Sequence, residues 1–171
     1  MSMLPPAPAA PAPIRALGTV IDWTIVAIGT VMVMLVFLNV IFRVTGGGIA
    51  WTTELCEFLM VWVTFLGGAA ASRRGLHMTI TEFLDKLGES GRRAADGTIQ
   101  LLCLGMLALL VWYGMGIVNA TWGNELTVLH IPMAVQYLAL PVGAGAMAVF
   151  TAWDLLQIAQ GRDRAQRYGV A

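Results

Sequence analysis

Charged residues are scarce in this chain of 171 residues. Asp, Glu, Lys and Arg together make up 12% of the sequence, whereas soluble domains carry about 25%. The ten acidic and ten basic residues balance, so the chain has no basic excess of the kind that favours nucleic acid. Hydrophobic residues make up 58%. This composition argues against an ordinary soluble domain and favours a membrane protein.

Histidine and cysteine are also rare, with two of each. His77 and His130 fall at opposite ends of predicted helices, about 30 Å apart, which is too far for both to bind one haem. Cys56 and Cys103 are expected at different membrane depths, so we interpret them as packing residues rather than as a disulfide or redox pair. The sequence has no metal-spaced cluster, phosphate-binding loop or nucleophile motif. We therefore expect no enzyme activity and no cofactor.

Long uncharged stretches are what the chain does have, at residues 23–42, 58–72, 97–124 and 131–153. A helix of about 20 residues crosses the roughly 30 Å hydrocarbon core of a bilayer. Three stretches reach that length, and the second does so only if its helix includes Glu54 and Glu57. We predict an all-α polytopic membrane protein with four transmembrane helices, at about residues 16–43, 51–74, 97–122 and 132–158.

Three shorter segments complete the predicted organisation. Residues 1–14 are rich in Ala and Pro and are expected to be a disordered tail, and the first apolar stretch lacks a cleavage pattern and should remain an anchor. The four helices make up a membrane domain expected over residues 15–160, and residues 161–171 after it are expected to be a basic tail. Between the second and third helices, apolar residues at helical spacing predict a short amphipathic helix over 79–88. That helix either lies on the membrane interface or packs on protein.

The basic residues predict the orientation. All of them except Arg43 lie before the first helix, in the loop after the second, or in the C-terminal tail. By the positive-inside rule, both termini and that loop are expected to be cytoplasmic. Trp23 and Trp153 then fall at one membrane interface and Trp51 and Trp122 at the other, as expected for aromatic belts.

Two carboxylates open the second helix. Glu54 and Glu57 are three residues apart and share a helix face, and Glu57 lies about 24 Å from Arg73 along the helix, within the membrane core. Either local thinning leaves both acids in headgroup water, or they face protein and meet a cation. Arg43 is the basic residue expected on that side, and we hypothesise that it pairs with Glu54 and ties the first two helices together.

The remaining features predict packing. The small residues from Gly67 to Ser72 permit a close helix approach, and Pro141 followed by glycines predicts a kink in the fourth helix. Polar residues near or inside the other helices are interpreted as interhelical hydrogen-bonding or interface positions: Asn39, Gln100, Asn119 and Gln136. The first, third and fourth uncharged stretches hold no charge, so the chain makes a poor ion-coupled carrier on its own. A small four-helix drug exporter is disfavoured because we find no acid within the first helix.

An ordered series of motifs resembles a known family. The series runs Asn39-Val-Ile-Phe-Arg43, Trp51-x-x-Glu54-Leu, Trp62-Val-Thr-Phe-Leu-Gly67, Arg73-Arg-Gly-x-His77, and Ile131-Pro-Met with Tyr137-Leu-Ala-Leu-Pro141. It is similar to the small membrane subunit of tripartite ATP-independent periplasmic (TRAP) transporters, the DctQ type, over about residues 15–160. The chain departs from the family where Thr53 replaces an acid and where Glu57 replaces a basic or small residue.

The resemblance implies a partner subunit rather than an isolated transporter. It implies a scaffold in the bacterial inner membrane that pairs with a large multi-helix permease, which holds the substrate and sodium sites. A periplasmic binding protein would deliver an organic acid for sodium-coupled uptake. Structural and partner-interface candidates are Arg43, Trp51, Glu54, Glu57, Gly67, Arg73, Arg74, His77 and Pro141. The alternative is a membrane-anchor subunit of a redox enzyme complex, which would require a bound cofactor.

Overall fold

The computed structural model describes residues 11–47, 49–75 and 89–161, and its ordered elements are helices. They are α1 (Ala12–Val44), α2 (Ala50–Arg73), α4 (Glu89–Ala120), α5 (Met133–Tyr137) and α6 (Ala139–Ala159). The predicted all-α fold is confirmed for these ranges. The helix predicted over 79–88, His77, and most of both terminal tails lie outside the described residues.

The first helix begins earlier than expected. Pro11 is the residue before α1, and Pro13 lies in its first turn, where a missing N–H breaks no intrahelical hydrogen bond. Residues 12–14, which were assigned to the disordered tail, are therefore helical. The prolines exclude a helix interior at these positions, but they are compatible with a helix start.

The fourth apolar segment is interrupted near its beginning. The helix α5 ends at Tyr137 and α6 begins at Ala139. Pro141 has no N–H to donate to the carbonyl of Tyr137, so the helical hydrogen-bond pattern is broken at this turn. The interruption lies where the proline predicts a kink.

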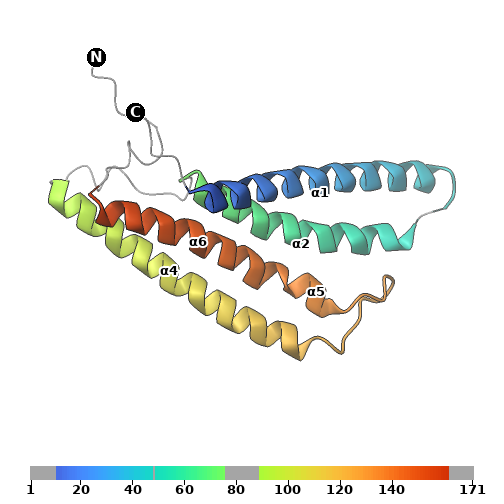
Figure 1. Ribbon diagram of the computed structural model, residues 1–171. Coiled ribbons are helices and arrows are strands. Elements are labelled where there is room, and N and C mark those ends of the chain that lie inside the picture. Colours follow the sequence, from blue (N-terminus) through green and yellow to red (C-terminus); the bar gives the residue numbers. More distant parts are fainter. Residues whose placement is uncertain (1–10, 48, 76–88, 162–171) are drawn as a thin grey trace, which may run out of the picture.

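The helices form an open layer. Figure 1 shows α1 and α2 as one antiparallel hairpin and α4 with α5–α6 as a second. The helices α2 and α6 lie in the middle, with α1 packed against α2 and α4 packed against α6. We call the end that holds Arg15, Arg73 and Asp154 the arginine end. The opposite end, with the connections 45–49 and 121–132, is the loop end.

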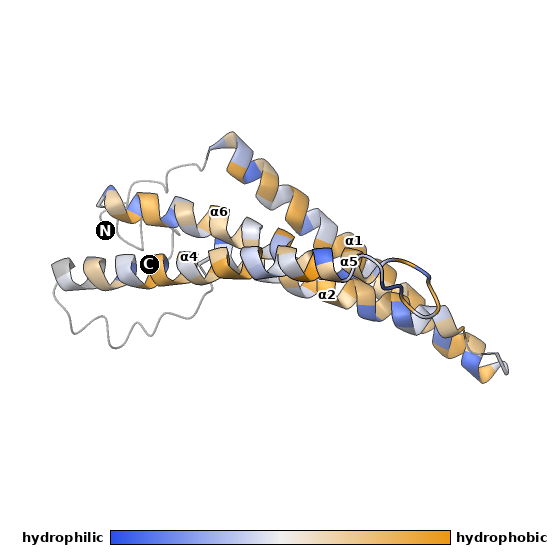
Figure 2. Cartoon of the chain, turned by 90° about the horizontal axis from the view of Figure 1, so that it is seen from below, coloured by the Kyte–Doolittle hydropathy of each residue, from blue (hydrophilic) through white to orange (hydrophobic). Residues whose placement is uncertain are grey.

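The buried core lies toward the arginine end. Residues from α1, α2 and α6 form it: Ile21, Leu66, Ala69, Ala70 and Phe150. The loop half of α1 is much more exposed, and Val33 keeps 70% of its surface accessible. Hydrophobic residues run along the length of the helices (Figure 2). Such exposed apolar surface is favourable against lipid or a protein partner, not against water.

Each of the four long apolar segments is long and hydrophobic enough to cross a membrane. These candidate spans are Ala12–Val44, Ala50–Arg73, Ala94–Ala120 and Met133–Ala159. The chain is therefore a multi-pass membrane protein, as its composition indicated.

Glycines set how closely the helices approach. A Cβ at Gly143 in α6 would lie 2.6 Å from Cβ of Phe65 in α2 and 3.0 Å from its backbone carbonyl. A Cβ at Gly114 in α4 would lie 3.1 Å from Pro141. These two glycines therefore allow α6 to approach α2 and α4. By contrast, a Cβ at Gly67 would meet no atom within 4 Å, so Gly67 is not part of a close crossing between the described helices.

Candidate functional site

The carboxylate of Glu54 binds three consecutive backbone amides of the connection between α4 and α5. The N–H of Thr127 donates to Oε1 at 2.7 Å, and the N–H groups of Val128 and Leu129 donate to Oε2 at 2.9 and 2.7 Å. Clustered backbone N–H groups form anion-binding concavities, and hydrogen bonds to an ionised acceptor are stronger than neutral ones. Glu54 thus fastens α2 to this connection at the loop end.

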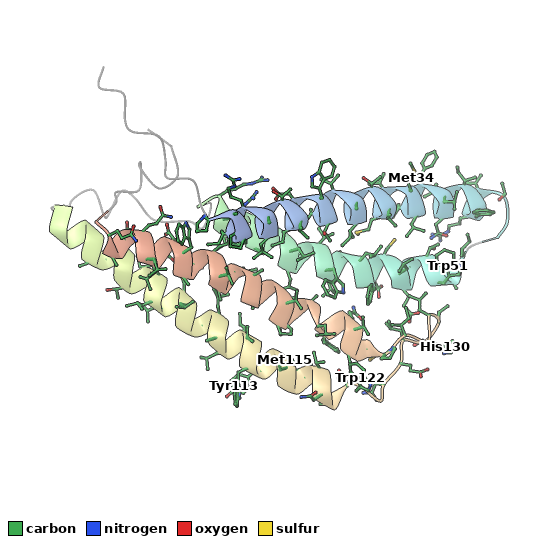
Figure 3. All side chains as sticks on the ribbon, in the orientation of Figure 1. Met34, Trp51, Tyr113, Met115, Trp122 and His130 are labelled. Atoms are coloured by element: carbon green, nitrogen blue, oxygen red, sulfur yellow. The ribbon has the colours of Figure 1, made fainter. Side chains whose placement is uncertain are left out.

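The same connection is folded by its own backbone hydrogen bonds. Leu126 N–H donates to the carbonyl of Ile131 at 2.9 Å, and His130 N–H donates to the carbonyl of Leu126 at 3.2 Å. Leu126 is buried, and His130 has a positive φ of 52°. The resulting tight turn presents the amides of residues 127–129 to Glu54. Figure 3 shows Trp51 and His130 at this loop end.

Arg43 does not bind Glu54. The two residues are both described, and no ion pair joins them; the contacts of the Glu54 carboxylate are to backbone amides instead. The hypothesis of an Arg43–Glu54 pair is therefore wrong in this structure. The loop-end contact between α1 and α2 is made by Asn39, whose Oδ1 accepts a hydrogen bond from Ile49 N–H at 3.4 Å.

Glu57 is in a different environment from Glu54, although the two were expected to share a face. Its residue is exposed while Glu54 is partly buried. Within the part of the chain that the structure describes, its carboxylate has no ion pair and no hydrogen bond. The carboxylate of Glu54 is therefore hydrogen-bonded within the chain, whereas the carboxylate of Glu57 is free to bind a group outside the described residues.

At the arginine end, Asp22 of α1 binds both arginines that follow α2. Arg73 Nη2 forms an ion pair with Oδ2 of Asp22, and Arg74 Nη2 lies 3.5 Å from Oδ1. The Arg73 side chain lies over Gly18, where a Cβ would overlap it. Arg73 and Arg74 were singled out from the sequence, but Asp22 was missed, and the statement that the first helix holds no acid is wrong. The available signal was an acid at the depth of two arginines on the neighbouring antiparallel helix.

Polar contacts also join the other helix pairs at the arginine end. Ser72 Oγ of α2 lies 3.5 Å from Thr151 Oγ1 of α6, and both residues are buried. Gln100 Nε2 of α4 donates to the carboxylate of Asp154 in α6, which confirms an interhelical hydrogen bond for Gln100. The order α1, α2, α6, α4 is thus connected by a polar contact at each step.

The described residues contain no metal-binding cluster. Among them, no group of three His, Cys, Asp or Glu side chains could hold a metal ion. Both cysteines are free. His130 Nδ1 lies 3.8 Å from Glu125 Oε2, and both side chains are largely exposed. Glu54, Asp22 and Asp154 instead attach helices and loops of this chain to one another.

The fold and these contacts define a small multi-pass membrane protein in which Glu54, Asp22 and Gln100 join parts of the chain to one another. The profile of a family described as "Tripartite ATP-independent periplasmic transporters, DctQ component" matches residues 32–161. The chain therefore belongs to the DctQ family, the small permease component of TRAP transporters, which is a transporter component and not an enzyme.

Individual relatives are consistent with this assignment. The chain is 32% identical over 127 residues to the C4-dicarboxylate TRAP transporter small permease protein DctQ of Rhodobacter capsulatus, covering 68% of this chain and 50% of the relative. It is 31% identical over 120 residues to the ectoine TRAP transporter small permease protein TeaB of Halomonas elongata, covering 67% and 62%.

A third relative is much longer than this chain. The isethionate TRAP transporter permease protein DctMQ of Oleidesulfovibrio alaskensis is 23% identical over 121 residues, which is 70% of this chain but 19% of that protein. The chain thus spans less than two thirds of the length of each of these three relatives.

Proposed function

We propose that this chain is the small permease subunit of a TRAP transporter and acts as a membrane scaffold. In this proposal it pairs with a large multi-helix permease in the bacterial inner membrane, and a periplasmic binding protein delivers the substrate for sodium-coupled uptake. The observation that supports the scaffold role is that Glu54 and Asp22 bind groups of the same chain. Glu54 binds loop amides and Asp22 binds arginines of the same chain, so these groups hold helices in place instead of forming an ion pathway.

Pairing with a large subunit is supported by the fused relative. The permease protein DctMQ is a much longer polypeptide, and 19% of it is similar to 70% of this chain. The chain also keeps apolar surface that lipid or a protein partner must cover, since Met34 on α1 and Tyr113 on α4 are 65% and 67% accessible (Figure 3).

An organic acid is the proposed substrate class. The names of three relatives specify isethionate, C4-dicarboxylates and sialic acid, which are organic acids, and a fourth names ectoine, a zwitterion that also carries a carboxylate. We assign recognition of the acid to the partner proteins, because the buried charges described above are already engaged within this chain. Binding assays on the periplasmic partner would identify the acid.

We propose that both termini are cytoplasmic. The basic residues are concentrated at the arginine end and in the adjoining segments of the sequence, which is the distribution expected for the cytoplasmic side. Reporter fusions after Gly161 and within residues 121–132 test this orientation. A reporter active only in the periplasm should work in the second fusion and not in the first; the reverse result would contradict it.

Co-purification tests the pairing. An affinity-tagged copy of this chain, co-expressed with the large permease of its transporter, should recover that permease from detergent extracts, whereas an unrelated four-helix membrane protein with the same tag should not. Recovery of the folded chain without the permease would contradict the proposal. A purified complex with haem or flavin absorbance would instead favour the redox-anchor alternative.

A further inference from the structure

Within the described parts of the chain, one face of α2 is uncovered from Thr53 to Gly67. Its exposed residues are Thr53, Glu57, Met60 and Thr64, and Gly67 continues the same stripe with no neighbouring atom around its Cβ direction. The spacing of three and four residues places these positions on one side of a helix. We call this stripe, Thr53–Glu57–Met60–Thr64–Gly67, the open face.

The neighbouring helices occupy the other sides of α2. Leu66 and Ala70 belong to the core shared with α1 and α6, and Phe65 and Ser72 contact Gly143 and Thr151 of α6. The helix positions of these residues lie away from the open face when 100° is allowed per residue. The described helices and connections therefore leave the open face without a protein cover.

Glu57 lies on the open face at a depth inside the membrane. The 24 residues of α2 span about 36 Å, and Glu57 is about 10 Å from the first residue. A hydrocarbon core of roughly 30 Å centred on this helix places Glu57 about 7 Å inside its boundary. Trp51, the aromatic residue at the loop end of α2, lies about 9 Å farther out along the helix.

An ionised carboxylate at this depth is costly against lipid, and acids within membrane helices normally face protein and pair with other groups. Glu54 and Asp22 follow this rule through contacts within the chain. The described contacts provide Glu57 with no such group. Its partner is therefore expected to come from another molecule.

We propose that the open face docks a transmembrane helix of the large permease and that this helix presents a Lys or Arg side chain to Glu57. The inference rests on the proposed function, since it names the face through which the two subunits pair. Gly67 permits the partner backbone to approach closely. Met60, which lies between Glu57 and Thr64 on the open face, provides apolar contact with the partner helix.

A second copy of this chain fits the open face less well. Two copies related by a two-fold axis would place the same patch against itself, which brings the two Glu57 carboxylates together. The described arginines of this chain lie near helix ends, as Arg15, Arg43 and Arg73 do, and not at the depth of Glu57. Charge complementarity thus favours a different chain that carries a cation inside the membrane.

Photo-crosslinking from defined positions tests the docking face. A photoreactive amino acid replaces Met60 or Thr64 on the open face, or Met106 or Leu109 on the exposed side of α4, in the full transporter in its native membrane. We expect crosslinks to the large permease from positions 60 and 64 and not from 106 and 109. Crosslinks from the α4 positions alone would show that the subunits pair through another face and would overturn this inference. A chain that neither crosslinks nor co-purifies with the permease would overturn the proposed function itself.

Charge reversal tests the role of Glu57. The variant Glu57→Lys should lower recovery of the co-expressed large permease at least about tenfold, because removing one member of a desolvated charge pair leaves the other unpaired. The matched control is Glu125→Lys, which makes the same change at an exposed acid of the loop end and should leave recovery unchanged. Equal recovery for Glu57→Lys and wild type would overturn the charge contact, with size-exclusion profiles confirming that both variants are folded.

Discussion

Glu54 is a charged residue near a membrane boundary that is satisfied by backbone groups instead of by a cation. Its two oxygens accept hydrogen bonds from three amides at 2.7 to 2.9 Å, whereas Arg43 stays exposed. Each contact joins α2 to the connection between α4 and α5. One side chain thus links the two hairpins of the fold at the loop end.

Removal of this side chain is predicted to release the connection. The variant Glu54→Ala deprives three backbone N–H groups of their acceptor, and we expect a loss of about 2 kcal/mol in the free energy of unfolding, since hydrogen bonds to charged groups contribute about 1.5–3 kcal/mol each and the site is partly exposed. Hydrogen exchange of the amides of residues 127–129, measured in detergent micelles, should become faster.

The matched control for this prediction is Glu57→Ala. It removes a carboxylate one helical turn away that has no described contact, so exchange at residues 127–129 should remain at the wild-type rate in the isolated subunit. Unchanged exchange in Glu54→Ala would show that the three hydrogen bonds do not hold the connection.

The sequence identified Glu54 as a significant residue but not its partner. The donors are the backbone amides of Thr127, Val128 and Leu129. Every residue except proline has a backbone N–H, so residue type does not indicate which amides bind Glu54. Residue type identifies only basic side chains as partners for a carboxylate, and Arg43 is the basic residue on that side. Asp22 was missed for a different reason: it lies inside the predicted helix 16–43 but one position before the uncharged stretch 23–42, so that stretch alone does not include it.

At the scale of elements, the crossing of α2 and α6 depends on glycine. Phe65 lies so close to Gly143 that a Cβ at that position would be 2.6 Å from the Cβ of Phe65 and 3.0 Å from its backbone carbonyl. Backbone atoms cannot rotate away as the end of a flexible side chain can. The distance between these two central helices is therefore fixed by the absence of a Cβ at residue 143.

The variant Gly143→Ala is expected to push α2 and α6 apart. Overpacking of this kind costs about 1–3 kcal/mol, and we expect a lower midpoint of unfolding in a mixed-micelle SDS titration. The control is Gly145→Ala in the same helix, where an added Cβ meets no atom within 4 Å. That change should be neutral or stabilise by up to about 1 kcal/mol, because alanine favours a helix over glycine. Equal destabilisation by both variants would contradict the role assigned to Gly143.

Helix spans were predictable from the sequence, whereas helix contacts were not. Uncharged stretches of membrane-spanning length identify the spans directly, and Pro141 predicted the interruption between α5 and α6. Which glycine meets a neighbour depends on the rotation of each helix about its axis. Adjacent glycines illustrate this, since a Cβ at Gly68 would contact Met147 while one at Gly67 would meet open space. A run of small residues does not specify that rotation.

At the scale of the whole molecule, the chain forms an open layer that is incomplete as a compact bundle. The edge helix α1 packs mainly on α2, and the most apolar 18 residues of this helix include no buried residue. The apolar surface that remains is favourable against lipid or a protein partner, not against water. Composition alone predicted a membrane protein, and the ordered motifs predicted the family. The open arrangement follows from tertiary contacts that composition does not encode.

The central claim is that this chain is a necessary scaffold of an uptake system and not a carrier by itself. The most direct test measures uptake of the radiolabelled organic acid that the periplasmic protein binds, in cells that retain the large permease and the binding protein but lack this chain. Immunoblots of the membrane fraction would verify that the large permease is still present. We predict that uptake falls to background and returns when this chain is supplied from a plasmid. Uptake at the normal rate without it would contradict the account.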